Sequence, residues 1–171
     1  MSVKLTVGDP IPSVGLRATD GYLLNLRSWA TKQPALLLFT GGPTLAGAAR
    51  RKGLRAIEAL GKGHGRLREA GIAVAAVSCD SVEQQIGFAT KQQLPFLLLS
   101  DERRSAVEML GIETVADGEN VNVAQPVAIA VDRDGIIRAV IERVEPEALT
   151  DQVIRALSEP IPAAAEDATT S

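Results

Sequence analysis

The side chains best suited to covalent chemistry are scarce in this chain of 171 residues, which has one cysteine, Cys79, and one histidine, His64. A single thiol cannot form an intramolecular disulfide or a two-cysteine redox couple, and these two residues cannot assemble the common zinc sites. The 3% aromatic content argues against a large stacking pocket for a flavin or a porphyrin. We therefore expect no metal and no cofactor.

Cys79 directly follows the apolar run 72–77, which has the length and composition of a buried strand. Ligands and catalytic groups gather at the carboxyl ends of strands in open α/β sheets. The helix expected to begin at Ser81 would favour a thiolate through its dipole, whereas the adjacent Asp80 would disfavour one. A free cysteine also packs commonly as a small buried hydrophobe. The sequence is therefore compatible with a reactive thiol and with an inert one.

Other candidate groups have simpler interpretations. His64 lies in the glycine-rich segment 61–65, where we expect a solvated surface turn. The same glycines do not form a dinucleotide fingerprint, because a helix and not a strand precedes them. Asp132 and Asp134 lie in an Asp-Arg-Asp-Gly sequence that is typical of a turn.

Composition and charge limit the classes of partner. The formal net charge is −3 and the pI is near 5.3, which leaves no cationic field for nucleic acid or an anionic membrane surface. No apolar run approaches the roughly 18 residues that a membrane span needs. We expect a cytoplasmic protein with a single domain over residues 1–159, followed by a disordered tail over residues 160–171.

The first half of the chain predicts a hairpin and two strand–helix units. Residues 16–19 and 22–26 flank Asp20-Gly21, the dipeptide of a type I′ turn. Apolar strands are expected at 35–39 and 72–77. Between them we expect a helix over 44–60, broken by the glycines at 61–65 and resumed until Gly71. Ser81 and Gln84 are spaced as a capping box for a helix that ends near Lys91.

The second half predicts a further strand and helix, a loop, a hairpin and a final helix. Residues 94–99 are expected to be extended, and Ser100-Asp101 to open a helix over 102–110 that Gly111 closes. Residues 112–125 are expected to form a loop, and 127–131 and 136–141 a hairpin. Pro146 introduces a helix over 147–157. This alternation predicts an α/β fold whose central mixed sheet is flanked by helices.

The order of these motifs resembles the peroxiredoxin superfamily of alkyl hydroperoxide reductase and thiol-specific antioxidant (AhpC/TSA) type. The resemblance rests on the segments 7–12, 20–21, 36–39, 77–81, 94–101, 110–112 and 131–138, which occur in the family's order and at about its spacing. It implies a thioredoxin-like fold of peroxiredoxin type over roughly residues 7–157. It also implies that Pro126, directly before the strand 127–131, follows a cis peptide bond, whereas the bare sequence is equally consistent with an ordinary proline at the start of a strand.

The resemblance places a peroxidatic cysteine in the first turn of the helix after the strand 35–39, where this chain has Leu45-Ala46-Gly47-Ala48. No cysteine occurs between residues 1 and 78, so the family's usual reaction has no nucleophile there. We expect a degenerate site that acts by binding a small molecule or a partner, or by a repurposed reaction. Its expected pocket consists of Thr40, Gly41, Gly42, Thr44, Leu45, Ala48 and Pro126.

Free amides at the start of that helix could bind a carboxylate or another small anion, although Thr44 and water could equally cap them. The alternative function is a single-cysteine thiol peroxidase or oxidoreductase in which Cys79 works with an external thiol or a protein reductant. The resemblance also allows a homodimer.

Overall fold

The computed structural model describes residues 6–40, 47–112, 114–117, 120–124 and 126–158. For residues 47–50, 114–117 and 120–124 the description covers the backbone. The predicted tail at 160–171 lies outside these ranges.

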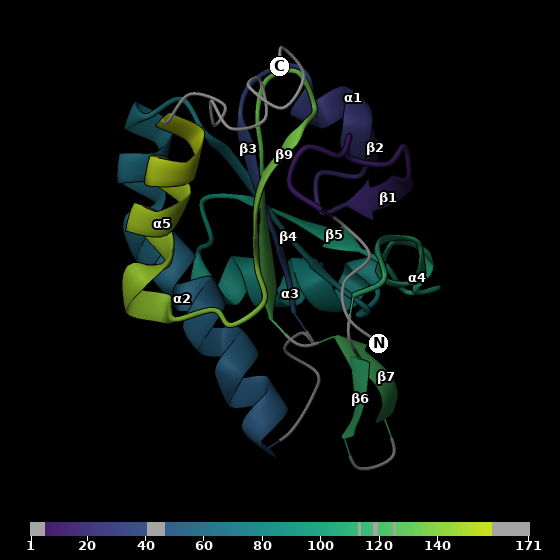
Figure 1. Cartoon of the computed structure of the whole chain (residues 1–171). Helices are drawn as coiled ribbons and strands as arrows, with labels where there is room; N and C mark the ends of the chain where they lie inside the picture. The colour runs from purple at the N-terminus through teal and green to yellow at the C-terminus, as the bar shows by residue number, and fades with distance from the viewer. Residues whose placement is uncertain (1–5, 41–46, 113, 118–119, 125, 159–171) are drawn as a thin grey trace.

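A seven-stranded mixed sheet forms the centre of the molecule (Figure 1). Its strand order is β2-β1-β5-β4-β3-β8-β9. The three middle strands β5, β4 and β3 are parallel to one another, and the strands on both sides of them run antiparallel. The bounds of the seven are β1 (Gly15–Ala18), β2 (Leu23–Asn25), β3 (Ala35–Phe39), β4 (Ala73–Ser78), β5 (Leu97–Ser100), β8 (Val127–Val131) and β9 (Ile137–Ile141).

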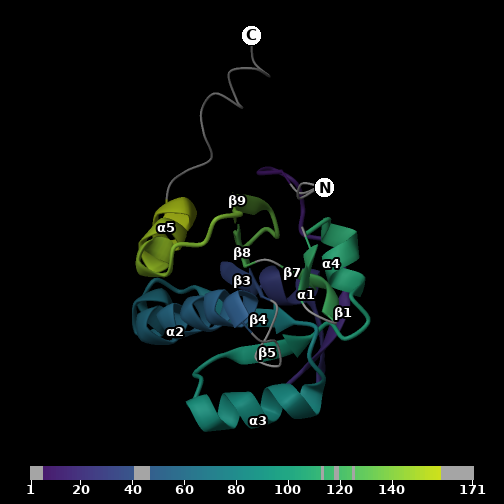
Figure 2. The same cartoon turned by 90° about the horizontal axis from the view of Figure 1, so that it is seen from below.

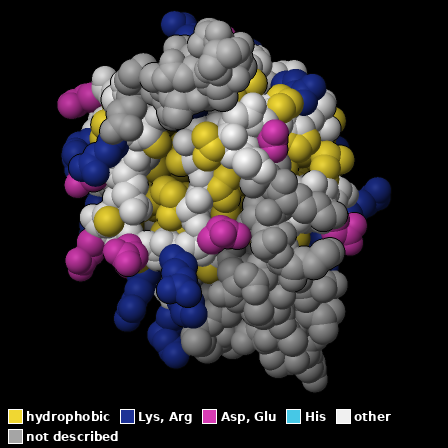
Figure 3. Space-filling view, viewed as in Figure 1, with side chains coloured by type: hydrophobic (Ala, Val, Ile, Leu, Met, Phe, Trp, Pro, Cys, Tyr) yellow, Lys and Arg dark blue, Asp and Glu magenta, His cyan; other side chains and the backbone are white. Residues whose placement is uncertain are grey.

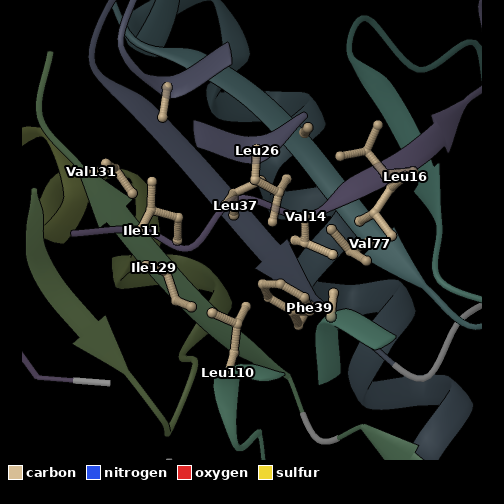
Figure 4. Packing of buried hydrophobic residues seen from close by; sticks show 14 of the residues in the cluster. Ile11, Val14, Leu16, Leu26, Leu37, Phe39, Val77, Leu110, Ile129 and Val131 are labelled. Carbon is tan, nitrogen blue, oxygen red and sulfur yellow. The ribbon is translucent and has the colours of Figure 1, made fainter. Parts of the chain in front are cut away.

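Helices cover both faces of this sheet, as Figure 2 shows along the strands. One face packs against α2 (Gly47–Glu69), α3 (Val82–Gln92) and α5 (Pro146–Ser158). The other packs against α1 (Leu26–Ala30) and α4 (Ser105–Leu110), with Ile11 and Val14 from the N-terminal segment (Figure 4). The predicted fold class, a thioredoxin-like mixed sheet flanked by helices, is therefore confirmed.

The middle strands are buried on both faces, which explains their continuous apolar sequences. Along β3, Leu37 and Phe39 join the core on the α1 and α4 side, whereas Leu36 and Leu38 join the core beneath α2 and α5. Strand side chains alternate between faces, so the residue after Phe39 turns toward the face of Leu36 and Leu38. This alternation orients the residues at the carboxyl ends of the strands.

The predicted break in the first long helix is wrong, because α2 runs without interruption through the glycines at 61–65. Gly63 is required where α2 crosses α5: a Cβ atom there would lie 2.1 Å from the Thr150 hydroxyl oxygen. Gly61 and Gly65 face open space. Packing of α2 on α5 thus outweighs the cost of about 1 kcal/mol for each glycine in the helix.

Three further predictions need correction, and one element was not predicted. Residues 112–125 are not simply a loop, since β6 (Thr114–Asp117) and β7 (Asn120–Ala124) pair as an antiparallel hairpin, a pairing that their sequence signals only weakly. The helix expected from residue 102 begins at Ser105, because Arg104 adopts a left-handed conformation with φ 60°.

The β1–β2 turn is not type I′, since Gly21 has a positive φ but Asp20 does not. The five-residue α1 was not expected at all, although Asn25 caps it by accepting the Ser28 amide.

The remaining elements agree with the sequence. The β1–β2 and β8–β9 hairpins form, and α5 begins at Pro146. The Ser81 hydroxyl accepts the Gln84 amide N–H while the Gln84 side chain accepts the Ser81 amide N–H, which is the predicted capping box.

Candidate functional site

The carboxyl ends of the three parallel strands bring three hydroxyl-bearing residues into one row. Phe39 pairs with Val77, so Thr40 is the next residue beside Ser78, and its backbone N–H donates to the Val77 carbonyl at 2.9 Å. Ser78 pairs in turn with Ser100 on β5. By strand alternation all three side chains belong to the face covered by α2 and α3. We call Thr40, Ser78 and Ser100 the hydroxyl row.

Cys79 comes directly after β4 at this edge, as predicted, and is half-buried against the core of the opposite face. Burial raises the pKa of its thiol, with nearby Asp101 and Asp80 acting in the same direction and Arg104 in the other, to about 11. At pH 7 a thiol with this pKa is ionised in about one molecule in 10⁴. The structure therefore gives Cys79 the opposite of the low pKa that activates a nucleophilic thiol.

A buried hydrogen-bond network surrounds Ser78. The Ser78 hydroxyl donates to Asp80 Oδ2 at 2.7 Å and accepts from Gln85 Nε2 at 2.9 Å. Gln85, from α3, also donates to the Leu99 carbonyl at 2.8 Å, and the Ser100 hydroxyl donates to the Asp80 carbonyl at 2.6 Å. Gln85 has no exposed surface and Asp80 is 4% exposed. The network thus ties the ends of β4 and β5 to α3.

Two polar atoms in this region have no hydrogen-bond partner. Thr40 Oγ1 and Gln85 Oε1 are both buried and unpaired, and Thr40 is only 1% exposed. A buried hydroxyl or amide without a partner costs about 1–3 kcal/mol. Both atoms flank Ser78, which has its own partners in Asp80 and Gln85.

Ser78, Gln85 and Asp101 are parts of this region that were not predicted from the sequence. Asp101 is 2% exposed and its carboxyl oxygens accept the amide N–H groups of Ala106 and Val107 at 3.0 and 2.9 Å, at the start of α4. Burial raises the pKa of this carboxyl, and these hydrogen bonds oppose the shift. The sequence does contain a signal for Gln85. It is a polar residue one helical turn after Ser81, on the face of α3 that packs inward.

Of the other predicted pocket residues, the structure describes Pro126 and the backbone of Ala48. Phe39 pairs with Val127, so Pro126 lies opposite Thr40 on the β8 side, where it is half-buried. Ala48 belongs to the first turn of α2. Gly41, Gly42, Thr44 and Leu45 lie outside the described residues. So does Gln125, which forms the peptide bond with Pro126 that is predicted to be cis.

His64 lies within α2 and not in the predicted surface turn, with its ring centroid 6.2 Å from that of Phe96. Over the described residues no group of three histidine, cysteine or acidic side chains is arranged to hold a metal ion. The same part of the chain contains no helix long and apolar enough to cross a membrane.

Comparison with known proteins settles the family. The sequence profile of the AhpC/TSA family matches residues 7–140. The chain belongs to the AhpC/TSA family. Peroxiredoxin Bcp of Escherichia coli K12 is 27% identical to it over 157 residues, which cover 91% of this chain and 97% of that protein. A putative peroxiredoxin bcp of Coxiella burnetii is 26% identical over 154 residues, 89% of this chain and 98% of that protein.

Solved structures of peroxiredoxins share the fold. Peroxidoxin BcpB from Mycobacterium tuberculosis superposes with a TM-score of 0.75 at 18% identity, covering 89% of this chain and 96% of that one. Reduced Prx3 from Vibrio vulnificus gives a TM-score of 0.75 at 16% identity, with coverage of 91% and 99%. The AhpC/TSA fold of this protein is therefore of the peroxiredoxin, thioredoxin-like type.

Proposed function

We propose that this AhpC/TSA protein is not a cysteine peroxidase and that it binds a small molecule at the carboxyl ends of β3 and β4. The observation that carries this proposal is the position of its only thiol, half-buried beside two acidic residues with a pKa raised to about 11. Peroxide reduction needs a thiolate that attacks the O–O bond, and these surroundings disfavour one. The family resemblance places the reactive thiol at Leu45–Ala48, where the sequence has none.

The proposed binding region is the vacated pocket that the sequence predicts. Of its residues, Thr40 directly follows β3 and Pro126 directly precedes the neighbouring β8, and Thr40 contributes a buried hydroxyl without a partner. A binding site of this kind keeps a few polar groups among apolar ones in order to orient its ligand. Gly41, Gly42, Thr44, Leu45 and Ala48 complete the proposed lining.

The test is peroxide turnover by the purified full chain. Wild type and Cys79→Ser are given hydrogen peroxide in two parallel assays. Peroxide consumption is followed with excess dithiothreitol, and intact mass is followed with a sulfenic-acid trap and no added thiol. We expect no more consumption than free cysteine gives, and no trapped adduct unless the chain is unfolded. Fast turnover by wild type would overturn the proposal. Turnover that survives Cys79→Ser would place a peroxidase activity outside thiol chemistry and overturn it equally.

The second candidate function is a single-cysteine peroxidase, which the names of the Escherichia coli and Coxiella burnetii relatives favour. In that reaction the Cys79 thiolate attacks a peroxide, forming a sulfenic acid and releasing an alcohol or water. Two external thiols then reduce the sulfenic acid to the thiol, forming a disulfide and water. The position of Cys79 at the end of β4, next to β3, supports this candidate. Turnover lost in Cys79→Ser is the result that would select it.

Cytoplasmic location and self-association are the remaining proposals. A lone cysteine suits a reducing compartment. β9 is one of the two edge strands of the sheet, and apolar side chains gather over it and toward α5 (Figure 3). Residues 8–11 already hydrogen-bond to Gly135 and Ile137, so the free part of this edge begins after Ile137. An outer strand of this kind can pair with a second copy. Sedimentation of the purified chain across a range of concentrations tests this, and a monomer throughout would exclude the homodimer.

A further inference from the structure

We propose that Thr40 and Gln85 form a paired hydrogen-bonding site for one uncharged, amide-like group of a small ligand. This inference gives the chemical class of the ligand in the binding function proposed above. It rests on the two buried polar atoms without partners, Thr40 Oγ1 and Gln85 Oε1.

Thr40 and Gln85 both lie next to Ser78. Thr40 is the neighbour of Ser78 on the next strand, and adjacent strands are about 4.8 Å apart. Gln85 Nε2 is 2.9 Å from Ser78 Oγ, and Oε1 belongs to the same amide group. The Gln85 amide is held in one orientation by its second bond, to the Leu99 carbonyl at 2.8 Å. One small group can therefore reach both unpaired atoms.

The unpaired atoms also specify what such a group must offer. Gln85 Oε1 is an acceptor only, so the ligand must present an N–H or O–H donor to it. The Thr40 hydroxyl can donate to an acceptor on the same ligand. A carbonyl oxygen next to an N–H, as in an amide, satisfies both atoms at once. Each new bond would relieve an unpaired buried atom, which favours the bound state by more than an exposed hydrogen bond would.

The charges nearby select against an anion. The Ser78 hydroxyl donates to the Asp80 carboxyl, which therefore lies beside the proposed site. A carboxylate ligand next to Ser78 would be repelled by this acidic group and would bring no donor for Gln85. The site thus suits an uncharged ligand and not the carboxylate or other small anion expected from the sequence.

A surface pocket lies at the β5 end of the hydroxyl row, whereas Thr40 and Gln85 themselves are buried. Ser100 lines a surface pocket of about 550 Å³ together with Ser81 and Asp101. Ser78 and Thr40 follow Ser100 along the hydroxyl row.

The test compares acetamide with acetate, two probes of nearly the same shape that differ in charge and in the N–H donor. The ¹⁵N-labelled full chain is titrated with each, and the signals of the Ser78 amide and the Gln85 side-chain amide are followed. We expect saturable shifts with acetamide and binding at least tenfold weaker with acetate. Thr40→Val, which keeps the shape of the side chain, should weaken acetamide binding at least tenfold and remain folded. Thr31→Val, at an exposed threonine of α1's C-terminus, should leave it unchanged.

Equal binding of acetate, unchanged acetamide binding in Thr40→Val, or no saturable shift with acetamide would each overturn the inference. Its failure is distinguishable from failure of the proposed function, which is measured by peroxide turnover. A chain that reduces peroxide through Cys79 and also binds acetamide through Thr40 would retain this site and lose the proposed function.

Discussion

Replacing Thr40 by valine should stabilise the ligand-free protein. Valine has nearly the shape of threonine and keeps a strand-favouring branched side chain, so it removes the unpaired hydroxyl without opening a cavity. An unpartnered buried hydroxyl costs about 1–3 kcal/mol, and the new methyl group adds buried apolar surface. We expect the free energy of unfolding to rise by about 1–2 kcal/mol, and the melting temperature by roughly 3–6 °C.

Urea unfolding followed by circular dichroism measures this change, and the two proteins should share the same m-value. Two controls separate the hydroxyl from packing. Thr40→Ser keeps the hydroxyl but loses a methyl, so it should lower stability by about 1 kcal/mol. Ser78→Ala removes a hydroxyl that is bonded to Asp80 and Gln85, and should lower stability by about 1–3 kcal/mol. If Thr40→Val lowers stability as Ser78→Ala does, the Thr40 hydroxyl already has a partner and the reasoning fails.

Two further predictions concern α2 and the thiol. Gly63→Ala should lower the free energy of unfolding by about 2 kcal/mol or more, because its Cβ would lie 2.1 Å from the Thr150 hydroxyl, whereas Gly61→Ala faces open space and should raise it by up to about 1 kcal/mol. Equal effects in urea unfolding would contradict the close crossing of α2 and α5. Because the pKa of Cys79 is raised to about 11, its alkylation by iodoacetamide in the native state should keep accelerating about tenfold per pH unit from pH 7 to 10. A rate that levels off near pH 8.5, as for an ordinary cysteine, would show that the thiol is not perturbed.

The chain's own sequence determined most of the fold. Continuous apolar runs such as 35–39 identify strands buried on both faces, and the capping residues of α3 act through neighbours four positions apart or less. The absence of a cysteine before Cys79 is a property of the sequence alone. These features were predictable because each depends on local chemistry or on composition.

Only the tertiary structure decided how distant residues act on one another. The glycines at 61–65 predict a break, yet Gly63 lies inside α2 because Thr150, far along the chain, approaches it closely. The sequence around Cys79 includes Asp80 but gives no sign that Asp101 faces the same sulfur. The unpaired atoms of Thr40 and Gln85 are likewise invisible in sequence, because a missing hydrogen bond depends on everything that surrounds an atom once the chain has folded.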